Sequence, residues 1–264
     1  MKLLHTTFND RFEEIISLWN RDITSNNYTA IFRVYIPYDY PDRLEILERI
    51  RAIIRTNAPD TLVIGCTSTG TIFDGKINDT DIIITASVFE DPDTKIQVVT
   101  TYEQPETYDT TTLLEYVNRI PDLKSIEIIT AASYEIMEPA GKVIDALPEN
   151  ILIFGGVAVG DDVNKAFVFA NDAPISTTGS VCVISSGKEF HIQANRIFGW
   201  KPIGYPLKVT KSVGHVVYEI DDKPAYEVYN HYLHIKKDDN FFYNALEFPL
   251  EVSTGDGTVF IRHA

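Results

Sequence analysis

Apolar residues recur at spacings of three and four near the start of the chain, which predicts an amphipathic helix. The residues at this spacing are Phe8, Phe12, Ile15, Ile16 and Trp19. They form a single stripe along about three helical turns. A helix with such a stripe needs an apolar surface to cover.

A second helix is predicted after the turn PYDYPD, because Pro41 and Asp42 are residue types that open helices. It ends before Pro59, since the residue preceding a proline disfavours helical backbone. The apolar stripe of this helix comprises Leu44, Leu47, Ile50 and Ile54. We expect both helices to pack on a sheet.

Unbroken apolar runs of strand length predict strands that are buried on both faces. We expect TLVIG (61–65) to be the central strand, and GTIFDGKIND to turn the chain back after it. Further strands are predicted at 31–36, 81–89, 125–133 and 150–156, with helices at 111–120 and 138–148. This alternation indicates a mixed α/β (α+β) fold, with layered mixed sheets and with helices on the amino-terminal half.

From about residue 166 the pattern changes to short strand-like segments separated by turn residues. The segments are KAFVFA, SVCVISS and EFHIQAN, and in the last of these His191 faces away from Phe190 and Ile192. Two short strands around Ser212 to Gly214 and a helix after Pro224 follow. The sequence therefore predicts two domains, 1–175 and 176–264, of which the second is richer in antiparallel strands.

The charge balance excludes several kinds of partner. With 23 Lys and Arg against 38 Asp and Glu, the net charge is −15, which repels nucleic-acid phosphates and anionic lipids. The segment MKLLHTTFNDRF lacks the apolar region of a signal peptide, and we expect no membrane span. We therefore expect a cytoplasmic protein that does not bind nucleic acid.

The stretch VIGCTSTG places a thiol and three hydroxyls directly after an apolar strand. Cys66 could be a nucleophile, half of a disulfide with Cys182, a small packed core residue, or part of a polar lip that holds a ligand. Two cysteines are too few for a secreted disulfide framework, so free thiols are expected. A nucleophile would need a histidine nearby, and the sequence does not indicate which of six it would be.

A second apolar strand runs into GGVAVGDD (155–162), which resembles a phosphate-binding loop only superficially. It lacks the Lys and Ser or Thr of a Walker loop and the spacing of a dinucleotide-binding turn. Asp161 and Asp162 are adjacent and are read as turn residues, so no metal or cofactor is expected. Glycines here and around Ser68 either shape tight turns only, or expose backbone N–H groups that suit a small carboxylate or amide.

Two of these stretches together resemble the FIST sensory domain family. VIGCTSTGTI with the later IFGGVAVGDD is similar to its amino-terminal half, and FGWKPIGYPLKVTKSVGHVVYEIDDKPAYEVY is similar to the start of its carboxy-terminal half. The resemblance spans about residues 28 to 262, and the second domain would be a FIST C-like domain cut short at Ala264. The matching motif residues are Gly65, Cys66, Ser68, Gly70, Gly155, Gly156, Asp162, Gly199, Trp200, Pro202, Gly204, Asp221, Pro224 and Ala225.

The resemblance implies a sensory module of signal transduction that binds a small ligand, amino acids among them, and passes the signal to an output domain or partner protein. The residues that we expect to hold the ligand are Cys66, Thr67, Ser68, Thr69, Gly70, Gly155, Gly156, Asp162, His191, Gly199 and Trp200. We expect binding without turnover. The alternatives are a hydrolase or transferase that uses Cys66, and a pure interaction module; a homodimer is compatible with either function.

Overall fold

The computed structural model describes residues 1–101, 114–115, 117–131, 147–148, 150–160, 165–195, 199–214, 216–253, 257 and 259–262. The chain forms two compact units, Met1–Ala194 and Asn195–Ala264. Over the described ranges, none of the helices combines the length and the apolar character that crossing a membrane requires.

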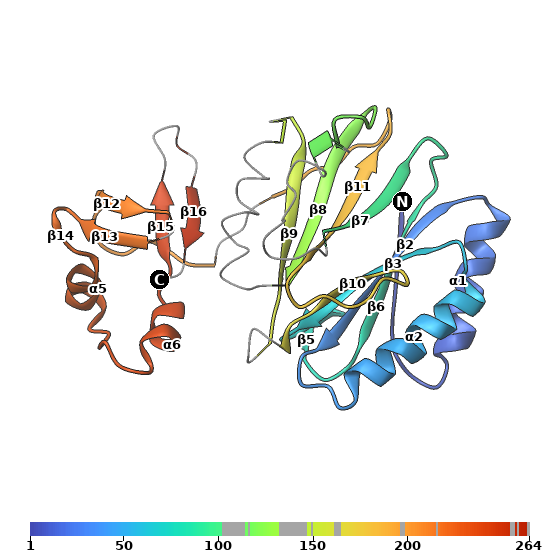
Figure 1. Ribbon diagram of the computed structural model, residues 1–264, viewed down its shortest axis with the longest axis horizontal. Helices are drawn as coiled ribbons and strands as arrows, with labels where there is room; N and C mark the ends of the chain where they lie inside the picture. Colours follow the sequence, from blue (N-terminus) through green and yellow to red (C-terminus); the bar gives the residue numbers. More distant parts are fainter. Residues whose placement is uncertain are drawn as a thin grey trace. The chain divides into compact units, whose positions relative to one another are not determined.

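The first sheet of the first unit has the strand order β1-β6-β2-β3-β10 (Figure 1). Its strands are β1 (Lys2–Thr7), β6 (Ile83–Phe89), β2 (Thr29–Pro37), β3 (Leu62–Ser68) and β10 (Val168–Ala170). β2 and β3 run parallel, and the other neighbours are antiparallel. The strands predicted at 31–36, 61–65 and 81–89 are confirmed. The prediction that 61–65 is the central strand is wrong, because only β10 lies outside β3, and β2 takes the middle position.

Two helices, α1 (Phe12–Ser25) and α2 (Arg43–Asn57), cover one face of this sheet, as Figure 1 shows. Their buried residues, such as Ile16 and Leu47, share one apolar cluster with Phe32 and Val34 of β2. Both helices were predicted from their apolar stripes and are confirmed. The buried residues of each stripe face the sheet because this removes apolar surface from water. Two residues of the predicted stripes differ: Leu44 is 51% exposed, and Phe8 precedes α1.

A second sheet packs against the opposite face of the first. Its order is β7-β11-β8-β9, formed by β7 (Lys95–Thr100), β11 (Ser180–Ser186), β8 (Leu123–Ala131) and β9 (Leu152–Ala158), with β8 and β9 parallel. An apolar cluster joins Ile31 and Ile64 of the first sheet to Ile129 and Val181 of the second. β3 is therefore covered on both faces, as its unbroken apolar run predicted. The strands predicted at 125–133, as far as Ala131, at 150–156 and at SVCVISS are also confirmed. The expectation that the strand at 150–156 is buried on both faces is wrong, because β9 is an edge strand with residues 154–157 exposed.

A short hairpin follows β3, where the sequence predicted a reversal of the chain. It pairs β4 (Thr71–Phe73) with β5 (Lys76–Asn78) around Asp74 and Gly75, whose φ angles are +49° and +74°. Two successive positive φ angles are typical of the tight turn that suits the twist of a hairpin. Of the helix predicted at 111–120, residues 114, 115 and 117 are helical and 118–120 are not, and the other four lie outside the described residues. The helix predicted at 138–148 falls outside the described residues except for 147 and 148, which are not helical.

The strand predicted at EFHIQAN does not form, and residues 190 to 195 have no regular structure. Both edges of the preceding strand β11 are already paired, one with β7 and one with β8, so this segment has no free neighbour there. It is held instead by Phe190, whose ring lies edge-on to Phe89 with centroids 5.9 Å apart. The alternation of polar and apolar residues was therefore misread as a strand.

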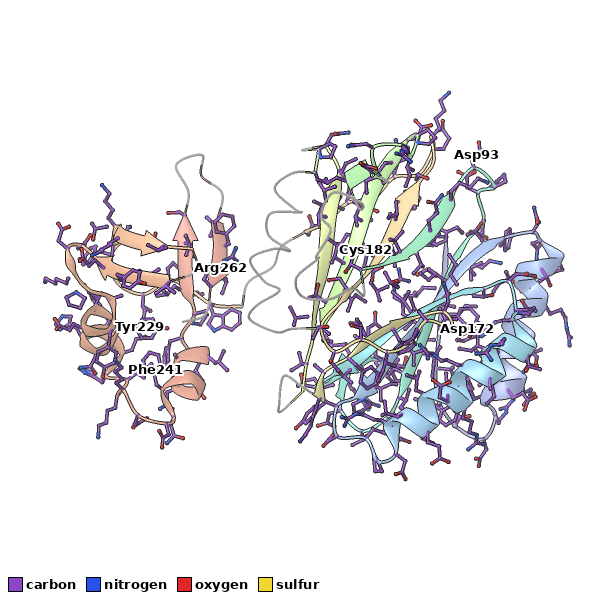
Figure 2. All side chains as sticks on the ribbon, in the orientation of Figure 1. Asp93, Asp172, Cys182, Tyr229, Phe241 and Arg262 are labelled. Carbon is purple, nitrogen blue, oxygen red and sulfur yellow. The ribbon has the colours of Figure 1, made fainter. Side chains whose placement is uncertain are left out.

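The second unit is a small antiparallel structure with two helices. Its strands are β12 (Val209–Val213), β13 (Val216–Ile220), β14 (Lys223–Pro224), β15 (Leu250–Ser253) and β16 (Val259–Arg262), and its helices are α5 (Ala225–Leu233) and α6 (Phe241–Leu246). Tyr229 and Phe241, labelled in Figure 2, bring α5 and α6 together with ring centroids 6.2 Å apart. The described strand pairs are all antiparallel, as expected for the carboxy-terminal part.

The two compact units divide between Ala194 and Asn195. The sequence placed the boundary after residue 175. The segment in between stays with the first unit because β11 pairs with β7 and β8 along most of its length.

Candidate functional site

A cleft of about 410 Å³ lies within the first unit, between its two sheets. Its size falls within the roughly 300–1,000 Å³ typical of small-molecule sites. The cleft is lined from β2, β3, β6, β8 and β9 and from the hairpin that follows β3. The described lining residues are Tyr35, Cys66, Thr67, Ser68, Thr69, Gly70, Thr71, Ile72, Ile83, Thr85, Glu127, Ile129, Gly155, Gly156, Val157 and Val159.

Cys66 lies on the inter-sheet face of β3, in the apolar cluster with Ile64, and is only 7% exposed. Burial raises the pKa of its thiol to about 12, and the negative charge of Glu127 adds to the rise. The thiol is therefore protonated at neutral pH, whereas a cysteine nucleophile needs the thiolate. These are the properties of a buried packing residue.

The second cysteine, Cys182 of β11, lies in a different apolar cluster from Cys66. Its neighbours there are Ile126 and Ile184, on the face of the second sheet that points away from the first. Both cysteines are free and buried. The disulfide alternative is therefore excluded.

Thr67 ties three segments together at the wall of the cleft. Its backbone N–H donates to the Phe167 carbonyl, its Oγ1 accepts from the Phe167 N–H, and its carbonyl accepts from the Val159 N–H, at 3.1, 3.1 and 3.2 Å. The side chain is 1% exposed. Thr67 therefore shapes the wall.

The Ser68 hydroxyl is used inside its own turn. It donates to the Gly70 carbonyl at 2.6 Å and accepts from the Gly70 N–H at 3.0 Å. This local ring fixes the loop at the mouth of the cleft. Thr69 lies between these residues and is exposed.

We expected the glycine pair 155–156 to follow a strand and to turn the chain, but the pair lies inside β9. Gly155 has a φ of +149°, and a Cβ on it would lie 1.8 Å from the Ile128 carbonyl oxygen, so only glycine fits the close approach of β9 to β8. Gly156 is the register partner of Ile129, and a Cβ on it would have no heavy atom within 4 Å. The expected sharp turn is therefore wrong, but Gly156 leaves open space in the cleft.

Gly65 also lies inside a strand, β3, instead of in a turn. A Cβ at this position would lie 2.4 Å from the Phe169 ring and 2.3 Å from the Val34 carbonyl oxygen. The residue is glycine because the aromatic ring of β10 packs directly on the backbone of β3.

An ion pair that the sequence analysis missed crosses the space between the sheets beside the cleft. Arg33 of β2 donates from Nε and Nη2 to the Glu127 carboxylate of β8, at 3.1 and 2.6 Å, and from Nη1 to the Ser87 hydroxyl at 2.9 Å. Burial lowers the pKa of Arg33, but the hydrogen bonds and charge of Glu127 outweigh it and raise the pKa. The available signal was a single ionisable residue inside each of two apolar strands, IFRVYI and SIEIITA.

Two further polar groups that line the cleft, with Cys66 and Glu127, are the hydroxyls of Tyr35 and Thr85. Tyr35 is the register partner of Cys66, and burial raises the pKa of its phenol to about 12, so it remains a hydrogen-bond donor across the physiological range. Thr85, on β6, is the register partner of Arg33. Neither hydroxyl has a hydrogen-bond partner among the described residues.

The remaining sequence-predicted residues are not among the described lining residues of the cleft. Asp162 is outside the described residues. His191 is exposed, and the described lining of the cleft does not include it. Gly199 and Trp200 belong to the second unit. The structure thus brings together Cys66 to Gly70 with Gly155 and Gly156.

Comparison with known proteins gives one match. The family model described as FIST N domain matches residues 34–223, which is more than half of the chain. The matched range includes β3, β6, β8 and β9 and the part of β2 that contains Tyr35, all of which line the cleft. No curated protein and no solved structure matches the chain.

Proposed function

The chain belongs to the FIST family of small-ligand sensory domains in signal transduction, and we propose that it binds a small polar metabolite, such as an amino acid, in the cleft between its two sheets. The observation that carries the proposal is that the Cys66 to Gly70 segment and the Gly156 backbone, far apart in sequence, line one cleft of about 410 Å³. Open space over Gly156 and unused hydroxyls at Tyr35 and Thr85 supply room and hydrogen-bonding groups.

Binding takes place without turnover in this proposal. The thiol is the nucleophile that the sequence offers, and its pKa of about 12 keeps it protonated at neutral pH. The two free, buried cysteines also suit a reducing compartment, and we propose a cytoplasmic location on that basis.

In this proposal the ligand produces a signal because it binds two states of the first unit with different affinities. A ligand that contacts both sheets favours the arrangement in which they close on it, because it shifts only an equilibrium whose states it binds unequally. An output domain or partner protein would respond to that shift.

The proposal is tested by a thermal-shift screen of the purified chain against amino acids and common metabolites, with calorimetry on the hits. A ligand at a hundredfold excess over its dissociation constant adds about 2.7 kcal/mol of apparent stability. A panel without hits would count against a small-molecule sensor.

The location is tested at Gly156, because a side chain there enters open space without meeting the backbone. Gly156→Leu should abolish binding of the hits, and Gly156→Ala should retain most of it, with both variants checked by circular dichroism. A hit that binds Gly156→Leu with unchanged affinity would place the site elsewhere. Ser68 is a poorer position for this test, since its hydroxyl holds the loop together.

A further inference from the structure

Among the described residues that line the cleft, the charged side chain is negative. Glu127 is an acidic residue, and no Lys, Arg or His is part of the described lining. Tyr35 and Cys66 are neutral at physiological pH, because burial raises both pKa values to about 12. An anion entering the cleft would therefore meet the Glu127 carboxylate, whose paired cation Arg33 is not among the described lining residues.

The carboxylate of Glu127 has hydrogen-bonding capacity left for a ligand. Arg33 donates to both of its oxygens, from Nε to Oε1 and Oε2 and from Nη2 to Oε2. Arg33 is not among the described residues that line the cleft, whereas Glu127 is. A carboxylate offers about four lone-pair sites, and the pair with Arg33 leaves some of them unused. Its side chain is 11% exposed, so this opening is narrow.

The negative charge of Glu127 acts inside the cleft. It contributes to raising the pKa of Cys66. At Tyr35, the register partner of Cys66 on β2, the positive charge of Arg33 lowers the pKa by more than Glu127 raises it. The charge of the carboxylate therefore reaches the Cys66 side chain, which lines the cleft.

We propose that the cleft recognises small primary amines, whose ammonium group donates to the Glu127 carboxylate, and that it rejects ligands whose only charge is negative. The inference rests on the proposed function, since it names the ligand chemistry of the same site. It narrows the class from polar metabolites in general to amines, and it excludes phosphates and simple carboxylates.

The rest of the cleft fits a short apolar body behind the ammonium group. Ile83 and Ile129 line it from the two sheets, and the Tyr35 and Thr85 hydroxyls are placed among them for one further polar group. An ammonium bound to a buried carboxylate makes a charge-assisted hydrogen bond, which is stronger than a neutral one.

Four probes with one carbon skeleton test the proposal: leucinamide, leucine, isocaproamide and isocaproate. Leucinamide and isocaproamide differ only in the amine, and calorimetry or ligand-observed NMR at millimolar concentrations measures their affinities. We expect leucinamide to bind at least about tenfold more tightly than isocaproamide, and isocaproate to bind most weakly. Equal binding of leucinamide and isocaproamide, tighter binding of isocaproate, or no binding of leucinamide would each overturn the amine class.

The variant Glu127→Gln tests whether Glu127 causes the preference for leucinamide over isocaproamide. It should reduce the affinity for leucinamide to that for isocaproamide, a loss of about tenfold to a hundredfold. Glu48→Gln is the matched control, because Glu48 also pairs with an arginine, at 2.9 Å, but lies outside the cleft; it should bind leucinamide like the unchanged chain. If Glu127→Gln does not fold, Arg33→Gln combined with Glu127→Gln removes both charges and should equally abolish the preference for leucinamide.

Failure of this inference is distinguishable from failure of the proposed function. If a folded Glu127→Gln variant still binds leucinamide more tightly than isocaproamide, the role of Glu127 is overturned, whereas the proposed function is not. Hits from the metabolite screen that carry no amine, and that are lost in Gly156→Leu, would overturn the amine class and leave the cleft as the sensory site.

Discussion

Arg33 on β2 and Glu127 on β8 form an ion pair that joins the two sheets of the first unit, with Nη2 2.6 Å from Oε2. Both side chains are largely buried, at 15% and 11% exposure. The residues are 94 positions apart in sequence, so the pair forms only when the sheets stack. It is a charged contact beside the apolar cluster between the sheets that includes Ile31 and Ile129.

Removing one partner of this pair should destabilise the fold more than removing both. Glu127→Ala or Arg33→Ala leaves an unpaired buried charge and should each cost about 3–5 kcal/mol, whereas Arg33→Met combined with Glu127→Met should cost much less than the sum. Urea unfolding of the unchanged chain, the single variants and the double variant gives the coupling energy. Additive single costs would mean that the two side chains do not interact in solution.

The adjacent glycines of β9 should respond to the same substitution with losses of stability of very different size. Gly155→Ala places a Cβ against the Ile128 carbonyl oxygen at a positive φ and should cost about 3 kcal/mol or more, whereas Gly156→Ala enters open space and should cost less than about 1 kcal/mol. Each variant is the control for the other in thermal unfolding. Similar melting temperatures for the two would contradict the described register of β9.

Native Cys66 should resist alkylation by iodoacetamide at neutral pH. A pKa of about 12 in place of 9.0 lowers the thiolate fraction by about three orders of magnitude, and burial blocks access as well. Mass spectrometry should show slow labelling of both cysteines in the native chain and fast labelling in denaturant. Rapid labelling confined to Cys66 would instead support the alternative of a thiol-dependent enzyme.

The stability of the fold should fall as pH rises from about 9 to about 12. The pKa values of Cys66 and Cys182 are raised from 9.0 to about 12 by burial, so in this window the unfolded chain has lost protons that the folded chain retains. Each thiol therefore lowers the free energy of unfolding by about 1.4 kcal/mol per pH unit within the window, and contributes no slope below it.

The measurement is the pH dependence of urea unfolding, compared with a Cys66→Ala and Cys182→Ala double variant. The double variant removes both thiols, so its decline above pH 9 should be shallower than that of the unchanged chain. Parallel curves would show that the two thiols ionise as easily in the folded chain as in the unfolded one.

Local periodicity was sufficient to predict α1, α2, the buried strands β2, β3, β6, β8 and β11 and the more exposed edge strand β9, because an apolar stripe or run indicates which side of an element must be buried. It failed at β1 and β7, which were not predicted, and at EFHIQAN, which alternates like a strand but has no free strand edge on β11. Strand pairing is a property of two segments, and one segment's pattern does not reveal its partner.

The same distinction applies to the candidate site. The sequence by itself singled out Cys66 to Gly70 and Gly155 with Gly156, since polar residues and glycines interrupt apolar strands only for a structural or functional reason. It could not distinguish the glycine that relieves a backbone contact, Gly155, from the one that leaves space, Gly156, because that depends on the neighbouring strand.

Only the tertiary structure decided that these segments line one cleft and that Glu127 is the charged residue in it. The protonation of Cys66 was decided in the same way, since the pKa of a thiol depends on how deeply it is buried and on the charges around it. The sequence determined which elements form and which faces they bury, because those follow from contacts between near neighbours. The stacking of two sheets determined the chemistry of the cleft, because it places residues from distant positions within reach of one another.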